Sequence, residues 1–143
     1  MSELFHSNDV SVVMDSSVIF DLHVLGCLEV IFKIFQVVGI PRVLYNDEID
    51  PIVCEVIDAD RCKIMDIKNK SGMDLYQTLV NDLKYRSLSR CDRFAIAIAK
   101  ESMYFCTSND KVIRRVCDEF GVRCTGVLGV LGRSMAHEGD LSR

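Results

Sequence analysis

The sequence contains little proline and glycine: of its 143 residues, 2 are Pro and 8 are Gly. Together with an apolar content of 49%, this scarcity excludes a disordered or collagen-like chain. A chain of this length is expected to form one domain that buries roughly 70% of the surface of its unfolded state. We therefore expect residues 1–143 to form a single domain with a substantial hydrophobic core.

Signals for targeting or for membrane insertion are also missing. The first residues, Met1 to Leu4, lack the basic region of a signal peptide. The most apolar stretch, Val24 to Ile40, is shorter than a membrane span and is interrupted by Glu29 and Lys33. We expect a cytoplasmic protein with no membrane partner, in which this stretch belongs to the core.

The seven cysteines lack the spacing of a metal-binding or redox motif. Their number is odd, no CxxC occurs, and the three histidines form no close pair with a cysteine. Most of them lie in apolar runs such as Met103 to Cys106. The sequence therefore predicts buried free thiols that pack as small hydrophobic side chains in a reducing compartment.

Short apolar runs alternate along the chain with segments of helical periodicity. The predicted strands are residues 11–14, 37–40, 62–67, 104–106 and 122–125. The predicted helices are residues 21–36, 43–49, 73–83, 90–101 and 111–120, with a further helical segment at 52–58, a helix or loop at 127–136 and a turn at 69–72. This alternation predicts an α/β fold, a three-layer α/β/α sandwich around a central parallel sheet.

Acidic side chains are placed where the ligands of such a sheet usually bind, beyond the carboxyl ends of the strands. Asp15 ends the first strand, Asp110 opens the helix after the fourth, and Glu48 and Asp92 could join them from helices. Carboxylates are hard oxygen ligands that suit Mg²⁺ or Mn²⁺. Without a cation, each close pair repels by about 4 kcal/mol at an effective dielectric constant near 20.

Each acid also has a structural interpretation. The spacing of Ser89 and Asp92 matches a capping box, and Asp110 suits the positive end of a helix dipole. Glu48 could be a solvated helix residue. Asp15 is the hardest to explain in this way, because an acid directly after a buried apolar strand gains little unless something binds it. Capping and metal binding can coexist at the same edge of the sheet.

Four segments around these acids resemble, in order, the motifs of PIN-domain nucleases. They are Val12–Ile19 with Asp15, Ile40–Ile49 with Glu48, Leu88–Ala99 with Asp92, and Cys106–Asp110 with Asp110. Gly126–Leu131 is similar to a tail found in one bacterial and archaeal branch of the family, and Asn109 stands where that branch often has a second acid. The resemblance covers about residues 11–139.

This resemblance implies an endoribonuclease that depends on Mg²⁺ or Mn²⁺, commonly the toxin of a toxin–antitoxin pair. Such proteins are often homodimers that a small antitoxin protein holds inactive. The resemblance places the metal on Asp15, Asp92 and Asp110, with Glu48 nearby or bound through water. Ser17, Ser108 and Asn109 could orient a carboxylate or the attacking water.

The net charge of −4 argues against a generally basic nucleic-acid-binding protein, but the charge is unevenly distributed. Residues 1–83 carry 6 basic and 14 acidic residues, whereas residues 84–123 carry 9 basic and 5 acidic ones, a local charge of +4. Positive side chains near the acids could contact RNA phosphates, or they could be solvated partners of nearby acids. The candidates are Arg90, Arg93, Lys111 and Arg114.

Two other functions are compatible with the pattern. In a non-catalytic, PIN-like interaction or dimerisation module, the acids would only cap helices. A domain that accepts a phosphoryl group on Asp15 is less well supported, because no second acid pairs with Asp15 after the first strand. The glycine-rich phosphate-binding motifs of nucleotide-binding folds are absent from the sequence.

Overall fold

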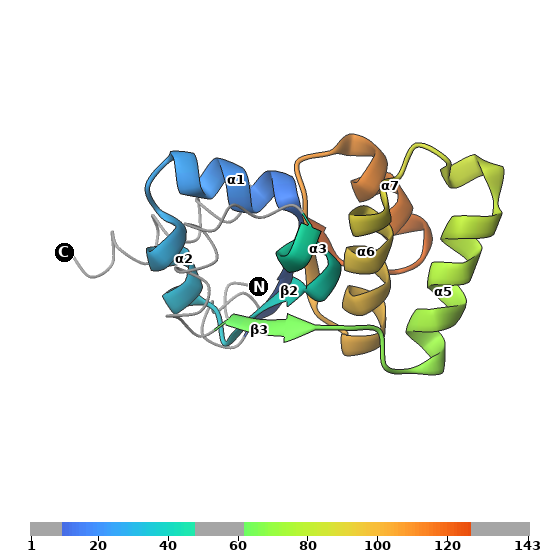
Figure 1. Ribbon diagram of the computed structural model, residues 1–143, viewed down its shortest axis with the longest axis horizontal. Helices are drawn as coiled ribbons and strands as arrows, with labels where there is room; N and C mark the ends of the chain where they lie inside the picture. The colour runs from blue at the N-terminus through green and yellow to red at the C-terminus, as the bar shows by residue number, and fades with distance from the viewer. Residues whose placement is uncertain (1–9, 48–61, 127–143) are drawn as a thin grey trace.

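The computed structural model describes residues 10–47 and 62–126 (Figure 1). Five parallel strands form one sheet in the order β3-β2-β1-β4-β5. They are β1 (Ser11–Met14), β2 (Val37–Pro41), β3 (Cys62–Met65), β4 (Phe105–Thr107) and β5 (Cys124–Thr125). Helices cover both faces, so the prediction of a three-layer α/β fold with a central parallel sheet is confirmed.

The last three residues of the central strand β1 are apolar and buried, because helices cover both faces of the sheet there. Val12 and Met14 point into one hydrophobic cluster, whereas Val13 points into a second cluster on the opposite face. Helices α1 (Ser16–Val24), α2 (Leu28–Ile34) and α3 (Arg42–Asp47) supply the first cluster. Helices α5 (Lys70–Asn81), α6 (Arg90–Ser102) and α7 (Lys111–Glu119), with the short helix η3 (Leu83–Tyr85), supply most of the second.

The single helix predicted for residues 21–36 is wrong. The structure has two helices there, and the first begins at Ser16 with Asp15 as its N-cap. Gly26 adopts the left-handed conformation with φ of 73°, which ends the first helix and redirects the chain into α2. The helical periodicity continues across this break because both helices bury their apolar side chains in the same cluster.

The turn predicted for residues 69–72 is also wrong, since α5 begins at Lys70. The carboxylate of Glu101, on α6, accepts hydrogen bonds from the backbone N–H groups of Lys68 and Asn69 just before α5. Gly72 lies against α6, where an added Cβ would come 3.2 Å from the carbonyl oxygen of Ala97. The glycine therefore serves close helix packing rather than a turn.

The other predicted helices agree with the structure to within a few residues. The capping box of Ser89 and Asp92 is present at the start of α6, and Gly121 follows α7 with φ of 73°. The end of the helix predicted at 43–49 and the segments 52–58 and 127–136 lie outside the described residues. Within the described part of the chain, the helices are all too short or too polar to cross a membrane.

We predict that Gly72→Ala lowers the free energy of unfolding by about 1–3 kcal/mol, because the new methyl group would crowd the Glu101 carboxylate and the α6 backbone. Urea denaturation followed by circular dichroism measures this change. Ser71→Ala is the matched control, since Ser71 is exposed on the same helical turn. A gain in stability from Gly72→Ala, as helix propensity alone would give, would contradict the close packing.

Candidate functional site

Three of the four predicted acids line one pocket at the carboxyl edge of the sheet. Asp15 directly follows β1, Asp110 follows β4, and Asp92 lies in the first turn of α6. The pocket has a volume of about 510 Å³ and is completed by Ser16, Ser17, Ser89, Asn109 and Ile113. Glu48 lies outside the described residues.

Each of these acids binds the backbone at the start of a helix. Asp15 Oδ1 accepts a hydrogen bond of 2.9 Å from Val18 N, and Asp110 Oδ1 accepts one of 2.7 Å from Val112 N. Asp92 Oδ2 accepts one of 2.9 Å from Ser89 N in the capping box. The positive ends of three helix dipoles therefore converge on the pocket.

A carboxylate that caps a helix can bind a further ligand at the same time. A carboxylate has two oxygens and about four lone-pair positions. The caps of Asp15 and Asp110 engage Oδ1, and that of Asp92 engages Oδ2. The capping roles expected for Asp92 and Asp110 are confirmed, and Asp15 also caps a helix, which the sequence did not predict. These caps are compatible with a shared ligand in the pocket.

Ser108 connects two of the acids from below the pocket. Its side chain is fully buried, hydrogen-bonds the Asp15 carboxylate, and accepts a hydrogen bond of 3.1 Å from Asp110 N. Ser17 Oγ donates a second side-chain hydrogen bond, of 3.0 Å, to Asp15 Oδ1. Both serines therefore fix the position of the Asp15 carboxylate.

The environment of Asp15 is unfavourable to a negative charge. The residue is 3% exposed, and this burial is the main cause that raises the pKa of its carboxyl group above the ordinary value. The nearby charge of Asp92 raises this pKa further. Hydrogen bonds from Ser108, Val18 and Ser17 oppose the shift but do not cancel it. A cation in the pocket would favour the ionised form.

Asn109 links the loop after β4 to α1. Its side-chain Nδ2 donates a hydrogen bond of 2.8 Å to Asp21 Oδ2, and the residue also lines the pocket. Thr107 connects β4 to β1, because its buried hydroxyl donates a hydrogen bond of 3.0 Å to the carbonyl oxygen of Val13. Asp21 and Thr107 were not predicted from the sequence, although a threonine that directly follows an apolar strand and precedes Ser108 was a usable signal.

The predicted basic residues have different surroundings. Arg93 donates to the backbone carbonyl oxygens of Leu79 and Tyr85, over 3.0 and 3.3 Å, and so connects α6 to α5 and η3. This geometry gives Arg93 a structural role and does not support phosphate binding. Arg90 is exposed and lies 3.7 Å from Asp47.

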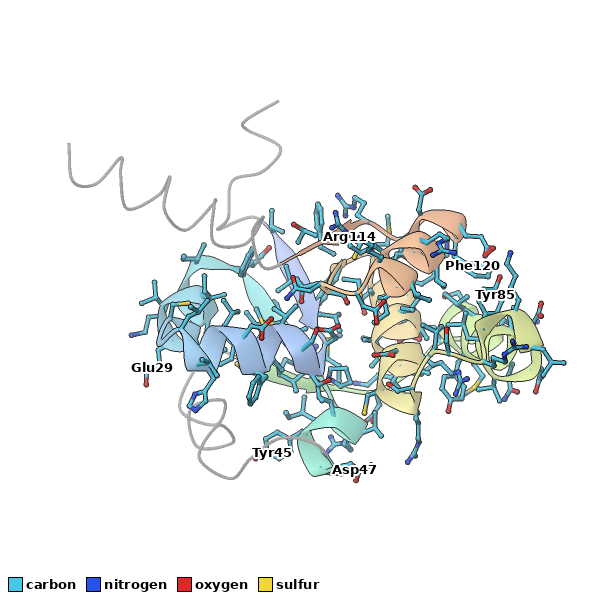
Figure 2. All side chains as sticks on the ribbon, turned by 90° about the horizontal axis from the view of Figure 1, so that it is seen from above. Glu29, Tyr45, Asp47, Tyr85, Arg114 and Phe120 are labelled. Atoms are coloured by element: carbon cyan, nitrogen blue, oxygen red, sulfur yellow. The ribbon has the colours of Figure 1, made fainter. Side chains whose placement is uncertain are left out.

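Three exposed cations lie on the helix that Asp110 caps, and two of them, Lys111 and Arg114, are predicted site residues. Lys111 is the first residue of α7, and Arg114 lies one turn further along. Figure 2 shows Arg114 on α7, well separated in this view from Asp47 on α3. Of the four predicted basic residues, Lys111, Arg114 and Arg90 are therefore the ones that are exposed to a ligand.

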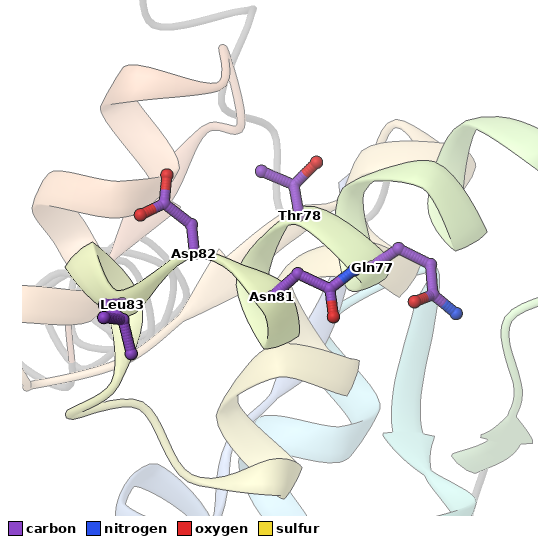
Figure 3. A pocket seen from close by; sticks show the side chains of 5 residues that line it. All are labelled: Gln77, Thr78, Asn81, Asp82 and Leu83. Atoms are coloured by element: carbon purple, nitrogen blue, oxygen red, sulfur yellow. The ribbon is translucent and has the colours of Figure 1, made fainter.

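A second pocket, at the junction of α5 and η3, has a similar volume of about 560 Å³ (Figure 3). It is lined by Gln77, Thr78, Asn81, Asp82 and Leu83. Its one carboxylate, on Asp82, caps η3 through Lys84 N over 3.0 Å. None of the predicted site residues lies there, so chemistry rather than size distinguishes the acidic pocket.

We predict that Asp15→Asn stabilises the metal-free protein at about pH 7. The folded state raises the pKa of Asp15 above its ordinary value of 3.8, so it binds the proton more tightly than the unfolded state does. The stability that Asp15 contributes is thus fully present below the unfolded pKa and is lost as the pH rises through the folded pKa. Asparagine is itself a good N-cap, so the helix start is retained.

Thermal unfolding of the wild type and of Asp15→Asn from acidic to neutral pH, with EDTA present, measures the effect. The difference in Tm should be largest at neutral pH and should shrink toward low pH. Asp82→Asn, at an exposed helix cap outside the pocket, is the matched control. A lower Tm for Asp15→Asn at neutral pH would show that the negative charge stabilises the fold.

A family model described as a PIN domain matches residues 11–141, which include all four predicted acids. No curated protein matches the sequence. The matched range covers most of the chain, and the parallel sheet with acids at its carboxyl edge agrees with the family that the four sequence motifs indicated. The chain therefore belongs to the PIN-domain family.

Proposed function

We propose that this protein is a metal-dependent endoribonuclease that hydrolyses RNA phosphodiester bonds. PIN domains are generally metal-dependent nucleases, and the family membership supports a nuclease-type function. The observation that carries the proposal is the pocket in which the buried Asp15 is brought together with Asp92 and Asp110.

The donor set fits a hard divalent cation. Three carboxylates line the pocket, and the raised pKa of Asp15 shows that its burial is unfavourable without a compensating positive charge. Asp15, Asp92 and Asp110 would hold Mg²⁺ or Mn²⁺, and Glu48 is the fourth acid that the sequence motif predicts. When bound, such an ion activates water for attack and neutralises charge on the phosphodiester.

The protein's own groups would position the substrate and the acids. Ser17 and Ser108 hold the Asp15 carboxylate, and three helix N-termini fix the direction of all three acids before a substrate arrives. The positive ends of these helices also favour a phosphate group in the pocket. Lys111 and Arg114, on the helix capped by Asp110, are placed to contact the RNA backbone.

The biological role that we propose is that of a toxin in a toxin–antitoxin pair. In this proposal the protein forms a homodimer, and a small antitoxin protein blocks the acidic pocket. The support is the resemblance of Gly126–Leu131 to the tail of the branch that contains such toxins. A short neighbouring reading frame that encodes a protein able to bind this chain and stop RNA cleavage is the expected finding.

The second candidate function is a non-catalytic interaction module. It is favoured by the observation that Asp15, Asp92 and Asp110 all cap helices, a role that needs no metal. The burial of Asp15 distinguishes the two functions, because an exposed aspartate such as Asp82 caps a helix without the cost of burying a charge.

We predict that the protein cleaves single-stranded RNA in Mg²⁺ or Mn²⁺ and that EDTA abolishes cleavage. Asp15→Asn should lower the rate by at least about 100-fold, the range seen when one group that stabilises transition-state charge is removed. Asp82→Asn should cleave at the wild-type rate. Gel analysis of end-labelled RNAs of varied sequence measures this. Uncut RNA with metal present, for the wild type and Asp15→Asn alike, would favour the interaction module.

We predict that Ser108→Ala lowers the cleavage rate by about 10- to 100-fold, as the loss of groups that orient metal ligands usually does. Without the Ser108 hydrogen bond the pKa of Asp15 rises further, so the acidic limb of the pH–rate profile should move to higher pH. Ser87→Ala, at an exposed position before α6, is the control. An unchanged pH profile would mean that Ser108 does not act through Asp15.

A further inference from the structure

Three cysteines from three different elements meet on one face of the sheet. Cys106 lies on β4, Cys124 on β5 and Cys117 on α7, and their Sγ atoms all lie within 4.8 Å of one another. Cys106 and Cys124 are direct partners in the register of the two parallel strands. Helix α7 packs on the same face of the sheet and brings Cys117 over this pair.

The spacing of the three sulfur atoms is close to that of a metal–thiolate centre. With metal–sulfur bonds of about 2.3 Å, sulfur ligands around one ion lie about 4 Å apart. The thiols therefore need to move by less than a bond length to bind a common ion. A disulfide would engage two of them and leave the third, so it does not account for the group of three.

The surroundings of the cluster allow an ion to enter and to be retained. Cys106 and Cys117 are buried, whereas Cys124 is half-buried at the edge strand and offers access from the surface. The second hydrophobic cluster encloses the buried pair and excludes competing water. Ordinary core packing would explain buried thiols, but it would not require three of them to face one another.

Electrostatics favour ionised sulfur at Cys124 but not at the other two thiols, since the neighbouring sulfur atoms and burial raise the pKa of Cys106 and Cys117. Hydrogen bonds from the Cys106 and Cys117 thiols lower the pKa of Cys124 to about 4, and the positive charge of Arg114 contributes to the shift. The thiolate is the form that binds metals, so the group holds one ligand ready and two thiols whose protons an ion would displace into solvent.

We propose that Cys106, Cys117 and Cys124 form a binding site for a thiophilic d¹⁰ metal ion, Zn²⁺ or Cu⁺, separate from the acidic pocket. Thiolates are soft ligands that prefer these ions, whereas the carboxylates prefer hard cations. The ion would join β5 to β4 and α7, the two elements that flank the loop with Ser108 and Asp110. It would therefore support the loop beneath the acidic pocket from a distance.

The test is titration of the reduced full-length protein with Co²⁺ or Cd²⁺, which give sulfur-to-metal charge-transfer absorption in the ultraviolet. We expect this band to saturate at one ion per chain, to be lost on addition of Zn²⁺ to the Co²⁺ form, and to accompany a rise in Tm. A parallel titration with Cu⁺ held by a chromophoric chelator determines which of the two ions binds more tightly.

Variants separate the site from other thiols and from the acids. Cys124→Ser should lose the band while keeping the circular dichroism of the metal-free protein, since Cys124 is half-buried. Cys27→Ser is the matched control because Cys27 is another half-buried thiol, on the other face of the sheet, and should retain the band. Asp15→Asn should also retain it.

Absence of the band at equimolar metal would overturn the proposal, as would its persistence in Cys124→Ser. Equal loss of the band in Cys27→Ser would point to other thiols and would also overturn it. Because the absorption arises from sulfur, the outcome does not depend on whether the acidic pocket cleaves RNA.

Discussion

The arrangement of the loops and helices at the carboxyl edge of the sheet depends on the hydrogen bonds of Asp15. Its carboxylate begins α1 by accepting from Val18 N, and the backbone N–H of Asp15 donates to the carbonyl oxygen of Thr107, at the end of β4. Ser108 then carries the connection to Asp110, at the start of α7. One charged group at the end of the central strand thus organises two helices and a loop, and it does so in a buried position where its charge is costly.

The cost of burying its charge distinguishes Asp15 from acids that only cap helices. Asp92, Asp110 and Asp82 cap helices at lower cost, because they lie nearer to solvent, and a cap is sufficient reason for such residues to be present. A buried carboxylate with a second acid nearby violates the usual preference for paired or solvated charges. Such violations tend to occur at functional sites, where a ligand supplies the missing partner. The buried Asp15 is therefore the residue that most strongly indicates a ligand in the acidic pocket.

The two groups of potential ligands lie on different parts of the same scaffold. The acids follow the ends of strands and begin helices, where backbone N–H groups stabilise oxygen anions. The three cysteines lie within β4, β5 and α7, where apolar packing protects sulfur from water. Hard and soft ligands are thereby kept apart, and Ser108, whose side chain hydrogen-bonds Asp15, lies two residues from Cys106.

The sequence by itself determined the strand–helix alternation, the parallel sheet and the positions of Asp15, Asp92 and Asp110, because these follow from local periodicity and from capping motifs within a few residues. It did not determine the break at Gly26, since apolar periodicity continues across it. The role of Gly72 depends on contact with α6, and the role of Arg93 depends on carbonyl groups of α5 and η3. Only the tertiary structure brought Cys106, Cys117 and Cys124 together, because strand register and helix packing, rather than spacing along the chain, decide which side chains meet.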